Sequence, residues 1–317
     1  MIKAALIKVL KSKIISYIFS RDIISDFFIK DKLIVFLFHE VSVNPSEFHR
    51  DHNLNVDPEI FEHQVKLIKR NFNIISPGDL NDNTMKLSDN NAMITFDDGA
   101  RGYFKNAVPI CEKYKIPSIH FLNMAPINGE VFWSGLISYL YKYKNDFRAD
   151  IDKQKKDLIE LNESYVNDYL SSQNSSEIHK KAREYYGEFA INEDLISSSK
   201  SKYVFFGNHL YNHFNCTRLS EVNLQDQYTK NHKILKKYDN YLGFFSYPFG
   251  QKKTCYNKNT NLTIDKLGAK KIFTSNPINY EYKEKIVHRI PLKNDIKDIN
   301  RLKSQIVLSR IHNLMRS

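Results

Sequence analysis

The sequence of 317 residues predicts an α/β protein in which strands and helices alternate, either a parallel barrel or a doubly wound sheet. Short apolar segments of strand type recur about seven times, and segments with a helical apolar period separate most of them. Polar side chains follow several of these strands directly, and the ends of parallel strands are where such folds collect functional groups.

The N-terminal segment 1–30 is predicted to form one or two amphipathic helices. Lysines at positions 3, 8, 11 and 13 interrupt its apolar residues, so neither the apolar core of a signal peptide nor a cleavage site is present. Its apolar runs are also shorter than the roughly 18 residues of a membrane-spanning helix. We expect it to pack on the body of the protein or, as a second use, to lie on the inner membrane face.

The body of the protein is predicted to span 31–317. Its first half begins with an apolar strand segment at 32–42. A helix is predicted from Pro58, because Asp57 is a good N-cap and proline is favoured at the first helical position. The next elements, in chain order, are a strand at 73–76, a helical turn at 77–80, a strand at 92–96, a helix at 102–114 and a strand at 116–123.

The alternation stops after Trp133. Residues 134–200 are polar, mostly helical in pattern and divided by serine-rich loops, so we predict a helical subdomain inserted into the body. The alternation then resumes with a strand at 203–208, a helix at 220–238, strands at 243–250, 269–275 and 285–292, and a final helix from Asp295.

The composition limits the partners and the compartment. The net charge of +11 is spread along the chain without a dense basic block, so nucleic acid is not an expected partner, whereas an anionic glycan or membrane surface is compatible. Cys111, Cys216 and Cys255 are isolated and form no CxxC pair, which argues against a disulfide framework and is compatible with a reducing compartment.

Two adjacent carboxylates end the predicted strand "MITF". Asp97 and Asp98 repel each other, and buried carboxylates are costly unless paired, so the site is either a solvated turn or a cation site. His209 and His213 follow another strand, four residues apart, a spacing that places both rings on one side of a helical turn. Either pair alone is weak evidence, but together they offer the ligands of a zinc-like ion.

The motifs "TFDDG" (95–99) and "HLYNH" (209–213) resemble the first two motifs of the polysaccharide deacetylases of the NodB-homology, carbohydrate esterase family 4 type. The resemblance implies a distorted (β/α)7 barrel and a metal-dependent enzyme that removes N-acetyl, less often O-acetyl, groups from sugars. It makes Asp97 the general base and Asp98, His209 and His213 the metal ligands. Zinc is the expected ion, with cobalt or nickel as substitutes in vitro. Leu210 stands where the family usually has Ser or Thr, which braces the loop without being a ligand.

The stretch "SYPFG" (246–250) resembles the third motif of the family, in which the backbone N–H at the Phe249 position helps to bind the oxyanion. Ser246 stands where the family usually has an arginine that orients the catalytic aspartate. We expect Arg289 to supply that charge from a neighbouring strand, with Arg101 as an alternative.

The last family motif is an apolar strand that ends in a histidine, the general acid. His288 lies near the C-terminus but its surroundings match poorly, whereas "VFLFHEV" (35–41) matches better and comes first in the chain. This order resembles the circularly permuted branch that acts on exopolysaccharides, so His39 is the expected acid. The alternative is a histidine packed in the core at a strand end.

Aromatic side chains near these motifs can stack on a sugar. Trp133, Tyr211 and Tyr247 are the expected substrate-binding residues, and Phe38 and Phe214 are further candidates. Packing in the core is the alternative for each of them.

Together, the resemblance and the composition predict a carbohydrate N-deacetylase that modifies a bacterial cell-surface polysaccharide, such as capsule or lipopolysaccharide O-chain. Its partner would be an N-acetylated sugar or glycan intermediate, and its location cytoplasmic, with peripheral membrane association through segment 1–30 as a second expectation. Three alternatives stay open: an inactive glycan-binding module, a C–N hydrolase for a small non-sugar amide, and a basic protein that binds nucleic acid or a membrane surface.

Overall fold

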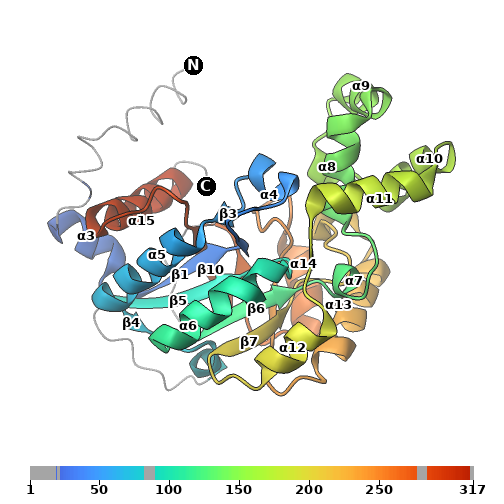
Figure 1. Cartoon of the computed structure of the whole chain (residues 1–317). Coiled ribbons are helices and arrows are strands. Elements are labelled where there is room, and N and C mark those ends of the chain that lie inside the picture. The colour runs from blue at the N-terminus through green and yellow to red at the C-terminus, as the bar shows by residue number, and fades with distance from the viewer. Residues whose placement is uncertain (1–18, 20–21, 82–89, 277–283, 315–317) are drawn as a thin grey trace.

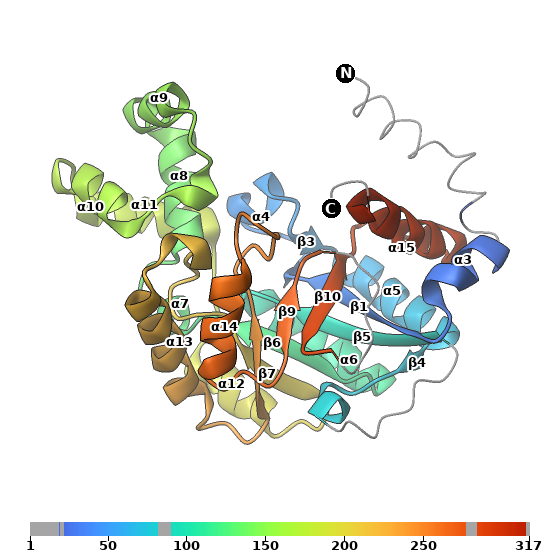
Figure 2. The ribbon, with the colours of Figure 1, turned by 180° about the vertical axis from the view of Figure 1, so that it is seen from behind.

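The computed structural model describes residue 19 and residues 22–81, 90–276 and 284–314. In this part of the chain, seven parallel strands close into a barrel in the order β1-β10-β9-β8-β7-β6-β5, and β5 pairs with β1 to complete the circle (Figures 1 and 2). The strands are β1 (Lys32–Phe38), β5 (Asn90–Phe96), β6 (Ser118–Leu122), β7 (Val204–Asn208), β8 (Tyr241–Ser246), β9 (Ile272–Thr274) and β10 (Ile286–Pro291). The short strand β4 (Asn73–Ile74) pairs with Asn91 and Ala92 near the start of β5. The predicted (β/α)7 barrel is therefore confirmed.

Alternate side chains of each strand point into the barrel or outward to the helices, as a strand period of two requires. Leu33 and Val35 of β1 belong to the apolar cluster inside the barrel, whereas Ile34 and Phe36 belong to the larger cluster under the helices. Val287 of β10 lies in the inner cluster. By the same alternation, Arg289 points into the barrel and its neighbour His288 points out.

The helices that cover the barrel largely follow the predicted pattern. Asp57 caps α5 through the backbone N–H of Glu59, as expected. A helix not predicted, α14, begins after a capping box in which the Asn257 side chain accepts the N–H of Thr260. The covering elements are α5 (Pro58–Asn71), the π-helix η2 (Tyr103–Ala107) with α6 (Val108–Tyr114), α12 (Asn192–Ser199), α13 (Glu221–Leu235), α14 (Lys258–Lys266) and α15 (Ile299–Leu314).

The N-terminal segment is described only in part. Helix α3 (Asp22–Ile29) packs beside the C-terminal helix α15 on the outside of the barrel (Figures 1 and 2). The other residues of the predicted helices, 1–18, 20 and 21, lie outside the described residues. Across the described ranges, we find no helix with the length and apolarity that crossing a membrane requires.

Several short elements connect the main ones. Between β1 and α5, the strand β2 (Glu40–Val41) pairs with β3 (Asn55–Val56), and the helix α4 (Glu47–Asp51) lies between them in sequence. The 3-10 turns are η1 (Pro77–Asn81), η3 (Leu158–Glu160) and η4 (Cys216–Arg218).

The chain between β6 and β7 is helical, as its sequence pattern predicted. It contains α7 (Met124–Ile127), α8 (Trp133–Tyr143), α9 (Asn145–Gln154), α10 (Glu163–Ser171), α11 (Ser175–Tyr186) and α12. Helices α8 to α11 project from one rim of the barrel, whereas α12 returns to its side (Figure 1). Apolar side chains of α8 and α11 belong to the same buried cluster as those of β1 and β5, so this segment and the barrel share one core.

Candidate metal and active site

The polar residues that follow the strands meet at one end of the barrel. Phe38 of β1 lies opposite Phe96 of β5, and the backbone N–H of Asp97 donates to the Phe38 carbonyl at 3.2 Å. His39 and Asp97, the next residues on the two strands, are therefore neighbours. On the other side of the site, the N–H of His209 donates to the Leu122 carbonyl at 3.2 Å.

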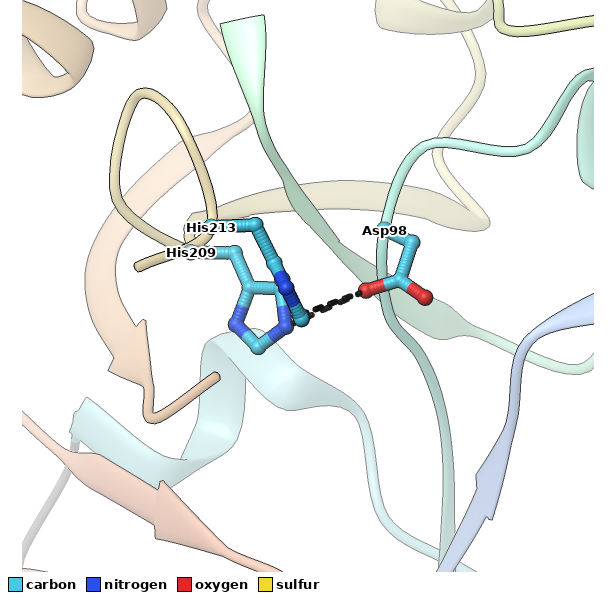
Figure 3. A group of neighbouring side chains, drawn as sticks. All are labelled: Asp98, His209 and His213. Atoms are coloured by element: carbon cyan, nitrogen blue, oxygen red, sulfur yellow. Dashed lines mark ion pairs between the residues drawn. The ribbon is translucent and has the colours of Figure 1, made fainter. Parts of the chain in front are cut away.

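Asp98, His209 and His213 form a compact buried group whose ligand atoms all lie within 4.8 Å of one another (Figure 3). The Oδ1 atom of Asp98 is 3.1 Å from Nε2 of His213 and 3.4 Å from Nε2 of His209. Within the described residues, this buried oxygen has no hydrogen-bond donor. A carboxylate oxygen and two imidazole nitrogens that converge in this way fit a divalent cation, which would satisfy all three.

The charge states of this group also suit a cation. Burial by itself raises the pKa of the Asp98 carboxyl, but His213 and His209 outweigh burial and hold that pKa well below its usual range. Burial lowers the pKa of His213, against the opposing effect of Asp98. The Nδ1 of His209 lies 2.8 Å from the Ser246 carbonyl and donates its proton there, which leaves the Nε2 lone pair free to bind an ion.

The backbone of the site adopts conformations that non-glycine residues seldom take. The φ angles are 76° at Asp98, 60° at Leu210, 59° at His213 and 61° at Phe249. Such left-handed conformations cost of order 1–3 kcal/mol each and persist where the surroundings enforce them, often at functional sites.

A buried network of asparagines enforces the turn that carries the histidines. The side-chain amide of Asn123 donates to the carbonyls of His209 and of Leu210, the latter at 2.9 Å. Oδ1 of Asn208 accepts the N–H of Leu210 at 3.0 Å, and the Asn231 amide donates to the same oxygen at 2.8 Å. These three asparagines were not singled out from the sequence, where asparagine is abundant and a buried one looks like any other.

Asp97 lies beside the candidate metal ligands and is held by Arg289. Nη1 of Arg289 donates to Oδ1 of Asp97 at 2.7 Å and Nη2 donates to Oδ2 at 2.6 Å, while both side chains are buried. Nη2 also donates to the Ser246 hydroxyl at 2.7 Å, and Nη1 donates to that of Thr95 at 3.3 Å. Burial by itself raises the pKa of Asp97, but Arg289 and then His209 reverse this and lower it.

The alternative arginine lies elsewhere. Arg101 pairs with Glu188 at 3.3 Å and with Asp194 at 3.1 Å on the chain between β6 and β7. The guanidinium beside Asp97 is therefore the one expected from β10. Ser246 lies where the family arginine is usual, and its hydroxyl accepts a hydrogen bond from that guanidinium.

His39 lies within the electrostatic reach of the same group. Burial lowers the pKa of its imidazole, and the charges of Asp98 and Asp97 oppose that shift. The alternative acid, His288, contacts the Thr274 hydroxyl at 2.7 Å on the outer side of β10.

Phe249, the expected oxyanion donor, lies beside the metal ligands, with 4.8 Å between the centroids of its ring and the His213 ring. In the described part of the chain, its backbone N–H donates to no acceptor.

The three aromatic residues expected to bind a sugar are all buried, with exposed fractions of 8% for Trp133, 2% for Tyr211 and 0% for Tyr247. Tyr247 offers no surface to a ligand, because its hydroxyl donates to Asn261 and its ring stacks on Tyr256 in a core cluster. The structure therefore does not support the expectation that Tyr247 contacts substrate. Trp133 packs on Phe214 at the start of α8, and the Tyr211 hydroxyl donates to Glu130.

Comparison with known proteins agrees with this fold. A model of the family described as "polysaccharide deacetylase" matches residues 84–272, well over half of the chain. A search of curated proteins gave no match. Among solved structures, IcaB from Ammonifex degensii has a TM-score of 0.59 at 16% identity, covering 87% of this chain and 97% of that one.

Two further solved structures have the same fold. The Streptococcus pyogenes deacetylase PplD in complex with acetate has a TM-score of 0.53 at 16% identity, covering 87% of this chain and 99% of that one. A de-N-acetylase from Aggregatibacter actinomycetemcomitans has a TM-score of 0.56 at 13% identity, covering 84% and 96%. Because the family model matches well over half of the chain, this chain is a carbohydrate deacetylase, and thus a hydrolase, of the polysaccharide deacetylase family.

Proposed function

We propose that this protein removes N-acetyl groups from an amino sugar of a bacterial cell-surface polysaccharide, such as capsule or lipopolysaccharide O-chain, with zinc as its metal. The observation that carries the proposal is the buried group of Asp98, His209 and His213 directly beside Asp97 and Arg289. The fold shared with IcaB and with a de-N-acetylase supports it at the level of architecture.

Asp98, His209 and His213 would hold the ion through one carboxylate oxygen and two Nε2 atoms. A divalent ion there would lower the pKa of a water molecule toward neutrality and polarise the acetamide carbonyl. The three side chains leave further coordination positions for water and substrate, as catalytic zinc sites do.

Asp97 is the proposed general base. Its Oδ2 lies 3.9 Å from Nε2 of His209, so a water molecule near the ligand atoms is within its reach. Arg289 binds both carboxylate oxygens and keeps the carboxylate ionised and oriented toward the site. A base held in this way accepts the proton that the attacking water gives up.

His39 and Phe249 are proposed to act on the substrate. The backbone N–H of Phe249 is a donor for the oxyanion that forms on the acetyl carbon, and removing such a donor typically costs on the order of 100-fold or more in rate. His39, on the Asp97 side, would donate a proton to the departing nitrogen, since a nitrogen that leaves without a proton is a poor leaving group. Burial lowers the pKa of His39, but the negative charges of Asp98 and Asp97 oppose that shift, which favours the protonated form that this role needs. The products are acetate and a free amino sugar.

The absence of the motif arginine favoured an inactive glycan-binding module. The bidentate contact of Arg289 with Asp97 removes the main reason for that alternative.

We further propose that the protein acts in the cytoplasm, on the glycan before export, with segment 1–30 as a peripheral membrane contact.

The experiment is acetate release from a panel of N-acetylated sugars in nucleotide-linked, lipid-linked and oligomeric forms, with zinc added. Asp97→Asn is the control, because it removes the base but keeps the size of the side chain. Release that is lost in the variant would support the proposal and identify the substrate class. Release from small non-sugar amides alone, or equal release by the variant, would contradict it.

A further inference from the structure

We propose that Ser134, in the helical chain between β6 and β7, is a positioning residue for the metal ligand His213. The inference rests on the proposed metal site and extends it. It means that helix α8, which lies outside the barrel strands, supplies part of the site.

The proposal rests on one buried hydrogen bond between Ser134 and His213. The Oγ of Ser134 lies 2.6 Å from Nδ1 of His213, with exposed fractions of 8% and 5% for the two residues. Nε2 of the same ring faces Oδ1 of Asp98 at 3.1 Å. For Nε2 to bind an ion, its lone pair must be free, so the proton must lie on Nδ1 and be donated to Ser134. The serine hydroxyl then accepts the Nδ1 proton and holds the ring in the orientation that metal binding needs.

The two histidine ligands differ in what holds them. His209 donates from Nδ1 to a backbone carbonyl, that of Ser246 at the end of β8, which no side-chain substitution removes. His213 depends on a side chain from a different part of the fold. The asparagine network holds the backbone of the turn, but the side chain of Leu210 is apolar and buried, so it offers the His213 ring no hydrogen bond.

Ser134 is itself held firmly, which a positioning residue requires. It is the second residue of α8, and the preceding Trp133 packs on Phe214 with 4.7 Å between ring centroids. The following Gly135 lies against the ring of Tyr186 of α11, so closely that a Cβ there would overlap it. Helix α11 therefore fixes the start of α8, and α8 fixes the imidazole of His213.

The test is the zinc affinity of the full chain, measured by competition with a chromophoric chelator. Ser134→Ala should bind zinc about 10–100-fold more weakly than the wild type, the usual effect of losing such an outer hydrogen bond. Ser134→Thr keeps the hydroxyl and should restore most of the affinity. The matched control is Ser138→Ala, one turn further along α8, whose hydroxyl contacts His52 at 3.1 Å instead of a metal ligand. Its zinc affinity should equal that of the wild type.

The outcomes separate the possible failures. If the wild type and Ser134→Ala bind zinc equally tightly, the inference is wrong and the proposed function is untouched. A lower unfolding temperature of metal-free Ser134→Ala with unchanged zinc affinity would mean a structural role only, and would also overturn the inference. A wild type that binds no zinc would overturn the proposed function and this inference with it.

Discussion

Replacing Arg289 with alanine should destabilise the protein far more than replacing an exposed arginine. The Arg289 guanidinium is buried and makes two short bonds to Asp97, at 2.6 and 2.7 Å, with further bonds to the Ser246 and Thr95 hydroxyls and the Thr274 carbonyl. Arg289→Ala leaves the Asp97 carboxylate buried without its cation.

The magnitude follows from that burial. Removing one partner of a buried ion pair typically costs about 3–5 kcal/mol, because the other charge stays out of water without compensation. A matched control is Arg301→Ala, since Arg301 pairs with Asp295 at 3.0 Å while both side chains are about half exposed. An exposed pair of this kind contributes about 0–1 kcal/mol.

The assay is urea unfolding of metal-free protein at pH 7. It compares the wild type with Arg289→Ala, Arg301→Ala, Asp97→Ala and the double variant in which both Asp97 and Arg289 are alanine. The double variant should cost clearly less than the sum of its two single variants, because the second substitution removes the charge that the first one stranded. Arg289→Lys should recover only part of the loss, since an ammonium cannot bind both oxygens in the same fork. A loss below about 1 kcal/mol for Arg289→Ala, or strictly additive losses, would refute this reasoning.

Three further substitutions test other parts of the structure. Burial raises the pKa of Glu40 from 4.5 to about 7. The wild type should therefore lose stability as the pH rises from 4.5 to 7, because only the unfolded state ionises in that range. In urea unfolding, Glu40→Gln should be more stable than the wild type by up to roughly 3 kcal/mol at pH 8 and by little at pH 4.5. Gly135→Ala should cost about 1–3 kcal/mol in the same assay, because the new methyl group meets the Tyr186 ring. Tyr247→Phe should lose about 1 kcal/mol with its bond to Asn261 and leave acetate release unchanged.

Each of these predictions has an outcome that would contradict it. A stability difference between Glu40→Gln and the wild type that stays constant from pH 4.5 to pH 8 would mean that the carboxyl is not held neutral. Gly78→Ala is the control for Gly135→Ala, since a Cβ at Gly78 makes only ordinary contacts, and equal losses would argue against the clash. A large loss of activity in Tyr247→Phe would return Tyr247 to the substrate site.

The local elements were largely predictable, because apolar period, caps and turns act over a few residues. The motif residues Asp97, Asp98, His209 and His213 could also be found, since each pair follows an apolar strand. That these pairs meet is a consequence of parallel strands, whose carboxyl ends share one face of the barrel.

The rest depends on which way each strand faces and on contacts between distant segments. Strand alternation places Arg289 inside the barrel and His288 outside. Which of the two side chains faces inward depends on the register in which β10 pairs with β9. The same alternation sends Tyr247 into the core beside α14, where the sequence suggested a sugar contact. Ser134 gave no signal, because one serine in a polar helical segment looks like a solvent-exposed residue until its distance to His213 is known.

The most direct test of the account is anomalous X-ray diffraction at the zinc edge from crystals of zinc-loaded protein. The account predicts a strong peak bonded to the Asp98 carboxylate and to Nε2 of His209 and His213, at zinc–ligand distances of roughly 2.0–2.2 Å. Asp98→Ala crystals, prepared in the same way, should lose that peak. No peak at these three side chains in the wild type, or a peak that persists in Asp98→Ala, would contradict the central claim that they hold a divalent ion beside Asp97.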